Sequence, residues 1–323
     1  MKGRIYLVKL IDYFYREPLM KLRIAKEKGL VLKDKKESKP YIFMVDGRIP
    51  HGGMFDRLKG LITIYAVAKT LGKDFRINWT YPFTLSKYLI PSKYDWLIDE
   101  SQMNFGIFSY HNVIAYGEYV SPNRLMKSRT KETHFYYGYN SLNEVNKVFG
   151  TNYSWGELYR ELFQPTPYLQ RYLDCYSAEI GQKYVAIHAR FLNLLGDKVE
   201  TAINPELASD KEKEKLVELA ISAVRNISSS HPHVRVMIAS DSMVFINRIK
   251  LEIPNVYIVP GEVKHIDTAG ATDDAENIKM FTDYYLISGA QKVYSLWHEG
   301  MWKSAFPEYA ALIGGVPFER IVF

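Results

Sequence analysis

The second half of the chain repeats one pattern: a short apolar run, a polar turn and a segment with helical periodicity. The apolar runs, which we expect to be buried strands, occupy residues 184–188, 234–239, 256–259 and 292–295. The helical patterns occupy residues 209–226, 243–251, 275–287 and 302–313. Strands and helices that alternate in this way wind a parallel sheet with helices on both faces. We therefore predict a doubly wound α/β domain.

The first half opens on a similar unit. An apolar run at 41–45 precedes the glycine turn His51-Gly52-Gly53, a helical pattern at 54–71 and a second apolar run at 75–79. This order predicts the strand–turn–helix–strand start of another open parallel sheet. No regular pattern follows at 80–165, so we expect an irregular, helix-containing region there.

Pro165-Thr166-Pro167 marks the change between the two halves. We expect a basic arm at 1–40, a Rossmann-like domain at 41–168 and a second one at 169–323. Residues 1–39 hold 12 Lys and Arg against 5 Asp and Glu, whereas the whole chain has a net charge of +6. We rank a solvated, loosely packed arm first and contact with an anionic membrane surface second. Nucleic acid ranks last, because the rest of the chain has no matching basic stripe.

The residue types exclude several kinds of chemistry. Cys175 is the only cysteine, which rules out an internal disulfide and a multi-thiolate zinc site and fits a reducing compartment. Neither His-Glu-x-x-His nor Asp-x-Asp occurs, so we predict no metal and no cofactor. A serine elbow and a dinucleotide fingerprint are also missing. Without an apolar run of 18 residues or a signal-peptide pattern, we expect a cytoplasmic protein, with a peripheral position at the inner face of the membrane as the variant.

Polar residues stand where the predicted strands end, which is where open α/β sheets bind ligands. They are His188-Ala189-Arg190, Ser240-Asp241-Ser242, Ser295 and His298-Glu299-Gly300 in the second half, and Gly52-Gly53 and Arg57 in the first. Arg190 offers a planar fork of donors that suits a diphosphate. The glycine turn precedes a helix whose positive end attracts anions. Taken singly, each feature also has a structural explanation: a core histidine, a surface ion pair and a tight turn.

Five segments match one set of family motifs in the same order. They are Gly52-Gly53-Met54-Phe55-Asp56-Arg57; His188-Ala189-Arg190 with Asp197-Lys198-Val199-Glu200; Ser240-Asp241-Ser242; Asp283-Tyr284-Tyr285-Leu286-Ile287-Ser288-Gly289-Ala290; and Ser304-Ala305-Phe306 with Ala310-Ala311. In these segments the chain resembles the α1,6-, α1,2- and protein O-fucosyltransferase superfamily. The resemblance covers 183–314 well and 41–79 moderately, and it leaves 80–182 without a counterpart.

The resemblance implies a GT-B-like α/β fold, in which two Rossmann-like domains face each other across a cleft. It also implies GDP-fucose as the donor, no metal, and inversion at the anomeric carbon. In that family scheme Arg190 holds the β-phosphate and neutralises the departing GDP, while His188 contacts the nucleotide. Asp283 corresponds to the carboxylate that reads guanine, and Asp241 lies near the ribose or the base. The Gly52-Gly53 turn and Arg57 correspond to the N-terminal glycine loop.

Two assignments stay open at this point. The spacing between Ser295 and Ser304 is longer than in the family, so either serine can be the phosphate contact, with Phe306 on the nucleoside side. An inverting transfer also needs a base to take the proton of the acceptor hydroxyl. Glu200 and Asp197 are the candidates by position, and a role as solvated loop carboxylates is an equal alternative.

The resulting hypothesis is an inverting, metal-independent fucosyltransferase that acts on a glycan or a lipid-linked oligosaccharide. We expect the donor to bind mainly the second domain and the acceptor mainly the first. One alternative is a glycosyltransferase of the same fold with another donor, such as a mannose- or heptose-type sugar nucleotide. Another is a non-catalytic protein that binds a nucleotide sugar or a glycan.

Overall fold

A computed structural model of the chain describes residues 15–32, 39–49, 52–115, 122–197, 209–261 and 273–323. These residues fall into two compact units. The N-terminal unit contains the described residues up to Ser86 together with Ile90–Gln164. The C-terminal unit contains Lys87–Leu89 and Pro165–Phe323. The C-terminal unit thus begins its main segment at Pro165, a few residues before the boundary expected at 168. It also includes residues 87–89 from earlier in the chain.

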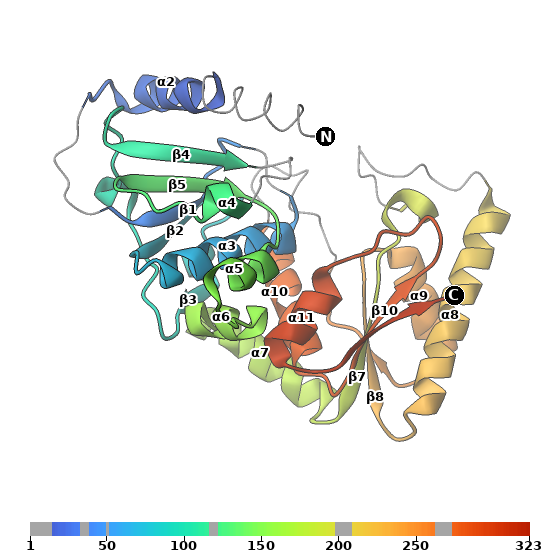
Figure 1. Ribbon diagram of the computed structural model, residues 1–323. Helices are drawn as coiled ribbons and strands as arrows, with labels where there is room; N and C mark the ends of the chain where they lie inside the picture. The colour runs from blue at the N-terminus through green and yellow to red at the C-terminus, as the bar shows by residue number, and fades with distance from the viewer. Residues whose placement is uncertain (1–14, 33–38, 50–51, 116–121, 198–208, 262–272) are drawn as a thin grey trace. The chain divides into compact units, whose positions relative to one another are not determined.

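The N-terminal unit is built on a four-stranded parallel sheet (Figure 1). Its order is β2 (Phe75–Trp79), β1 (Tyr41–Val45), β5 (Glu132–Tyr137) and β4 (Tyr110–Ala115). The predicted strands at 41–45 and 75–79 are confirmed residue for residue. The expectation of an irregular region at 80–165 is wrong for β4 and β5, because both strands carry polar residues in the interior. Glu132, for example, is 1% exposed and accepts hydrogen bonds from Asn104 N (2.8 Å) and Nδ2 (2.7 Å).

Helices cover both faces of this sheet (Figure 1). α3 (Met54–Thr70) lies on one face, and α2 (Glu17–Lys28) lies on the other. We expected the N-terminal arm to pack loosely, but Met20 and Ile24 of α2 are buried in a cluster with Met44 and Tyr110 of the sheet. The remaining elements are η2 (Leu85–Lys87), η3 (Glu100–Gln102), α4 (Pro122–Leu125), α5 (Leu142–Phe149), α6 (Trp155–Leu162), and the two-stranded sheet of β3 (Leu89–Pro91) and β6 (Phe163–Pro165).

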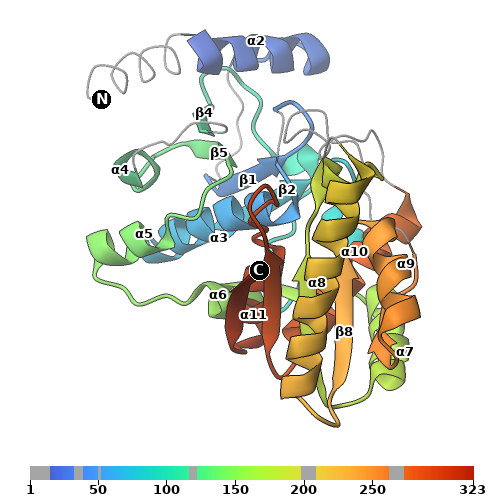
Figure 2. The same cartoon turned by 90° about the vertical axis from the view of Figure 1, so that its right-hand side faces the viewer.

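The C-terminal unit is a doubly wound parallel sheet, as predicted, and it contains five strands rather than the four expected. Its order is β11 (Phe318–Val322), β10 (Val293–Trp297), β7 (Tyr184–Ala189), β8 (Arg235–Ser240) and β9 (Val256–Tyr257). Figures 1 and 2 show α8 (Asp210–Ser230) and α9 (Met243–Glu252) along one face of the sheet. α7 (Pro167–Ile180), α10 (Asp274–Ser288) and α11 (Phe306–Gly314) lie on the other face.

Several boundaries in this unit differ from the sequence-based expectations, and one strand was not expected. β10 continues past Ser295 to Trp297, so Ser295 lies within the strand rather than at its end. α11 begins at Phe306 instead of Trp302, with Pro307 in its first turn, where proline fits a helix. β11 has no predicted counterpart. Most of its residues are only half-buried or exposed, as is usual for an edge strand, so its sequence lacks the apolar run of a central strand.

Candidate nucleotide site in the C-terminal unit

The strand order of the C-terminal sheet places its ligand-binding edge beside β7. From β7 the chain builds β8 and β9 on one side and then returns to add β10 and β11 on the other. The crevice outside the carboxyl ends of the two strands at such a reversal is the usual ligand site of doubly wound sheets. β7 ends in His188 and Ala189, and Arg190 follows directly. The His188-Ala189-Arg190 segment therefore lies at the topological switch point.

His188 packs against the start of α11. Its ring stacks on that of Phe306, with 5.4 Å between the ring centroids and an angle of 24° between the planes. Ser304 precedes α11, and its Oγ accepts a hydrogen bond from Phe306 N (3.2 Å). Ser295 is paired in register with His188 on the neighbouring strand. The structure thus brings four of the sequence-predicted residues into one neighbourhood at the reversal point.

Asp241 holds the backbone that follows β7. Its carboxylate accepts hydrogen bonds from Phe191 N (2.8 Å) and Leu192 N (3.0 Å), and its Oδ2 lies 3.9 Å from Arg190 Nε. Leu192 has a φ of 53°, a left-handed conformation that is uncommon for residues other than glycine. The two hydrogen bonds fix this unusual loop. Asp241 therefore orients the segment that carries Arg190, whose side chain is 18% exposed.

Asp197 lies at the amino end of α9. Its Oδ2 accepts hydrogen bonds from Ser242 Oγ (2.8 Å) and Val244 N (2.9 Å). Ser242 is the N-cap of this helix and in turn accepts from Phe245 N. A carboxylate in this position satisfies helix N–H groups and interacts favourably with the helix dipole. The other candidate base, Glu200, lies outside the described residues.

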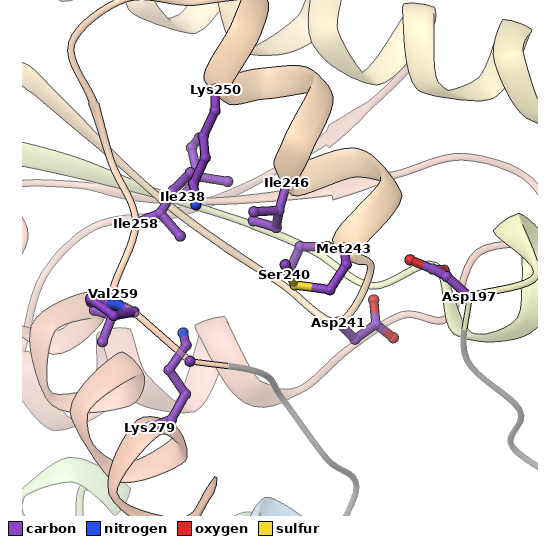
Figure 3. A pocket seen from close by; sticks show the side chains of 12 residues that line it. Asp197, Ile238, Ser240, Asp241, Met243, Ile246, Lys250, Ile258, Val259 and Lys279 are labelled. Atoms are coloured by element: carbon purple, nitrogen blue, oxygen red, sulfur yellow. The ribbon is translucent and has the colours of Figure 1, made fainter. Parts of the chain in front are cut away.

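A cavity of about 250 Å³ opens beyond the ends of β8 and β9 (Figure 3). Its walls combine aliphatic side chains with polar groups, and the polar groups come from the end of β8, from the segments after β7 and β8, and from α9 and α10. The lining residues are Asp197, Ile238, Ser240, Asp241, Met243, Ile246, Lys250, Ile258, Val259, Pro260, Gly261 and Lys279. The cavity adjoins Asp241, which in turn lies next to Arg190. A ligand can therefore place an apolar, ring-shaped part in the cavity and an anionic part at Arg190.

Asp283 forms a buried ion pair with Lys279, one turn earlier on α10. The Lys279 Nζ to Asp283 Oδ2 distance is 2.5 Å, and both side chains are 5% exposed. Burial raises the pKa of the Asp283 carboxyl, while the ammonium of Lys279 opposes that shift. Lys279 lines the cavity and Asp283 does not. Sequence reasoning missed Lys279, although an oppositely charged pair at i and i+4 on a helix was a readable signal.

The predicted residues of the N-terminal unit form a structural cluster of their own. Arg57 is 1% exposed and donates from Nε to Gly52 O (2.8 Å) and from Nη1 to Tyr81 O (2.9 Å). Its guanidinium lies 5.7 Å from the ring centroid of Trp79. Gly53 is the N-cap of α3. Arg57 thus holds the glycine turn through its hydrogen bond to Gly52 O.

The described part of the chain contains no group of three or more His, Cys, Asp or Glu side chains that could hold a metal ion. Within the same ranges, no helix combines the length and the apolar character needed to cross a bilayer.

Comparisons with known proteins connect the chain to other proteins through its fold. No protein-family model matches the sequence, and no curated protein matches it either. Among solved structures, fucosyltransferase NodZ from Bradyrhizobium matches 85% of this chain and 94% of its own, with a TM-score of 0.55 and 12% identity. An Arabidopsis thaliana FUT1 mutant in complex with GDP matches 93% of this chain and 74% of its own, with a TM-score of 0.59 and 12% identity. A NodZ α-1,6-fucosyltransferase co-crystallised with GDP matches with a TM-score of 0.54 and 13% identity. The chain therefore shares its two-unit α/β fold with these fucosyltransferase structures.

Proposed function

We propose that this protein is an inverting, metal-independent glycosyltransferase that moves fucose from GDP-fucose to a glycan or a lipid-linked oligosaccharide. One observation carries the proposal: Arg190 stands at the switch point of the C-terminal sheet, held next to Asp241, which also lines a cavity of about 250 Å³. That arrangement provides for a diphosphate and a nucleoside side by side, as expected for a nucleotide sugar. The GDP and GDP-fucose complexes among the solved structures of this fold support guanine as the base.

In the proposed reaction the bond between fucose C1 and the β-phosphate oxygen breaks as the acceptor oxygen attacks C1 from the opposite face. Negative charge grows on the departing GDP, and the guanidinium of Arg190 neutralises it with a two-pronged set of donors. The acceptor hydroxyl loses its proton to a carboxylate. Asp197 already accepts two hydrogen bonds through Oδ2 at the start of α9, which favours Glu200 as that base.

We assign the phosphate contact to Ser304 rather than to Ser295. Both serines are 2% exposed, so their places in the fold decide between them, and Ser295 lies inside β10. Ser304 lies at the start of α11, where the positive end of the helix dipole and backbone N–H groups favour an anion. Phe306, the first residue of that helix, stacks on His188 and can form the apolar side of the nucleoside site.

Thermal unfolding with a panel of nucleotides tests the donor. We expect GDP to raise the melting temperature by several degrees, because a ligand at 100 times its Kd adds about 2.7 kcal/mol to the free energy of unfolding. UDP and ADP are the matched controls and should have a much smaller effect. A transfer assay with GDP-fucose in EDTA, with the anomer of the product read by NMR, then tests turnover, metal independence and inversion. Stabilisation by a UDP-sugar instead of GDP would support the same-fold alternative, and binding without turnover would support a non-catalytic binding protein.

A specific feature of α2 also supports peripheral contact with an anionic membrane. Leu19 and Leu22 of this helix are 47% and 60% exposed, next to the exposed Arg23, Lys26 and Lys28. Apolar and basic side chains on one exposed helix match the interface of an anionic bilayer, where each cation near the surface contributes about 1 kcal/mol.

Co-sedimentation with vesicles tests this contact. The full-length protein should pellet with vesicles that contain phosphatidylserine and much less with pure phosphatidylcholine vesicles. The double variant Leu19→Glu with Leu22→Glu should reduce pelleting several-fold. Val148→Glu is the control, because Val148 is a 54% exposed apolar residue on α5, away from this helix. Equal pelleting of wild type and double variant would contradict the contact.

A further inference from the structure

The cavity beyond β8 and β9 has a single buried cation in its wall. Lys279 is 5% exposed in its side chain and comes from α10, whereas the other lysine of the cavity, Lys250, is exposed. Figure 3 shows the nitrogen of Lys279 directed towards the side of the cavity where Val259 and Ile258 lie. A buried ammonium in an aliphatic wall provides directed N–H donors to whatever fills the cavity.

Asp283 explains how this cation is kept in place. It accepts one hydrogen bond from the ammonium, at 2.5 Å between Nζ and Oδ2. An unpaired ammonium in such a place would be strongly disfavoured, and the pair removes most of that cost. An ammonium has three N–H groups, and among the described residues Asp283 is the hydrogen-bond partner of one of them. Within that part of the chain, the other two N–H groups can donate to a ligand group that accepts hydrogen bonds.

The size and walls of the cavity favour one flat, uncharged ring system. Its volume of about 250 Å³ lies below the roughly 300–1,000 Å³ typical of sites for drug-sized molecules. Ile238, Ile246 and Ile258 provide apolar surfaces for such a ring. The carboxylate of Asp283 balances the charge of Lys279, so a neutral base adds no net charge to the buried site.

We infer that Lys279, positioned by Asp283, reads the base by donating to the carbonyl oxygen at position 6 of a 6-oxopurine. This inference builds on the proposed function and replaces the sequence-based expectation that Asp283 itself reads guanine. Asp283 does not line the cavity. Its Oδ2 is occupied by the ammonium, and its Oδ1 is buried without a hydrogen-bond partner among the described residues. A purine with an amino group at position 6 would set its N–H donors against those of Lys279, which leaves both groups without an acceptor.

The two schemes make different demands on the base. Reading by Lys279 needs the 6-oxo group and ignores the 2-amino group. Direct reading by the Asp283 carboxylate needs the N–H groups at positions 1 and 2, which lie on the same edge of guanine. Inosine diphosphate keeps the 6-oxo group and lacks the 2-amino group. 2,6-Diaminopurine riboside diphosphate keeps the 2-amino group and lacks the 6-oxo group.

Isothermal titration calorimetry of the full-length protein with these nucleotides tests the inference. We expect GDP and inosine diphosphate to bind alike, and the diaminopurine nucleotide and ADP to bind about 10- to 100-fold more weakly, as expected for loss of a hydrogen bond to a charged group. In Lys279→Met the ratio of GDP to diaminopurine affinity should fall close to one. Lys279→Met combined with Asp283→Leu removes both charges and keeps the interior apolar, so it gives the same readout if the single variant fails to fold.

The matched control is Lys215→Met, which removes one exposed positive charge from α8 and should preserve the full selectivity. A markedly weaker affinity for inosine diphosphate than for GDP would overturn the inference in favour of reading by a carboxylate, because these two nucleotides differ only in the 2-amino group. Unchanged selectivity in the Lys279 variants would overturn it as well, while GDP binding and fucosyl transfer would still support the proposed function. Failure of the wild-type protein to bind any guanine nucleotide would overturn both.

Discussion

Replacement of Arg190 by alanine is expected to reduce fucosyl transfer by about 10²- to 10³-fold, the usual effect of removing one preorganised donor from a developing negative charge. The reason is the position of Arg190 at the end of β7, next to Asp241. The fold should remain intact, because the side chain is partly exposed and its distance of 3.9 Å from Asp241 indicates a weak ion pair. Transfer rates from GDP-fucose and the melting temperature measure the two effects separately.

Two further variants sharpen this test. Arg190→Lys keeps the charge but loses the planar fork, so we expect only partial recovery of the rate. Arg225→Ala removes a 53% exposed arginine that pairs with Glu252 on the helical side of the same unit, and it should leave transfer unchanged. Transfer by Arg190→Ala at the wild-type rate would remove Arg190 from the mechanism.

The sequence predicts the sheets well wherever strands are apolar. β1 matches its expected bounds and β7 differs by one residue, because buried parallel strands read as continuous apolar runs. β2 also matches its expected bounds, although Arg76 and Asn78 interrupt its apolar residues. β5 was not predicted, because this interior strand contains Glu132 and His134 and so lacks a continuous apolar run. The two side chains form a hydrogen bond of 2.6 Å with each other. The two residues are i and i+2 on one strand and therefore share a face, but the sequence alone does not show that this face is buried.

In the candidate site, too, the sequence predicts the place of some residues and not of others. Strand ends predict where Arg190 and Asp241 stand, because the carboxyl ends of parallel strands meet at one edge of the sheet. Motif matching also selects Asp283 but not its partner, since the sequence does not reveal which of two residues on one helix face points into a cavity. For Arg57 the sequence suggests an anion-binding side chain but does not reveal its contacts within the protein. Its Nε and Nη1 donate hydrogen bonds to the backbone oxygens of Gly52 and Tyr81.

Asp241 is expected to show the second large effect, this time on both stability and function. Asp241→Ala leaves the N–H groups of Phe191 and Leu192 without their acceptor, and both residues are at most 1% exposed. Each unsatisfied buried donor costs about 1–3 kcal/mol, so the loss of both should lower the free energy of unfolding by about 2–6 kcal/mol. Chemical denaturation of the ligand-free protein measures this loss. Asp210→Ala, at a fully exposed position, should change it by less than about 0.5 kcal/mol.

The functional part of this effect follows from the loop that Asp241 holds. Without the two hydrogen bonds, Leu192 has no reason to keep its left-handed φ of 53°, and the segment after β7 can relax to a more common conformation. Arg190 then loses its orientation, and transfer should fall about 100-fold, a usual result of small misplacements of a catalytic group. If Asp241 instead served only as a ribose contact, Asp241→Ala would weaken GDP binding and leave the stability of the ligand-free protein unchanged. The stability measurement therefore separates a positioning role from a purely ligand-binding one.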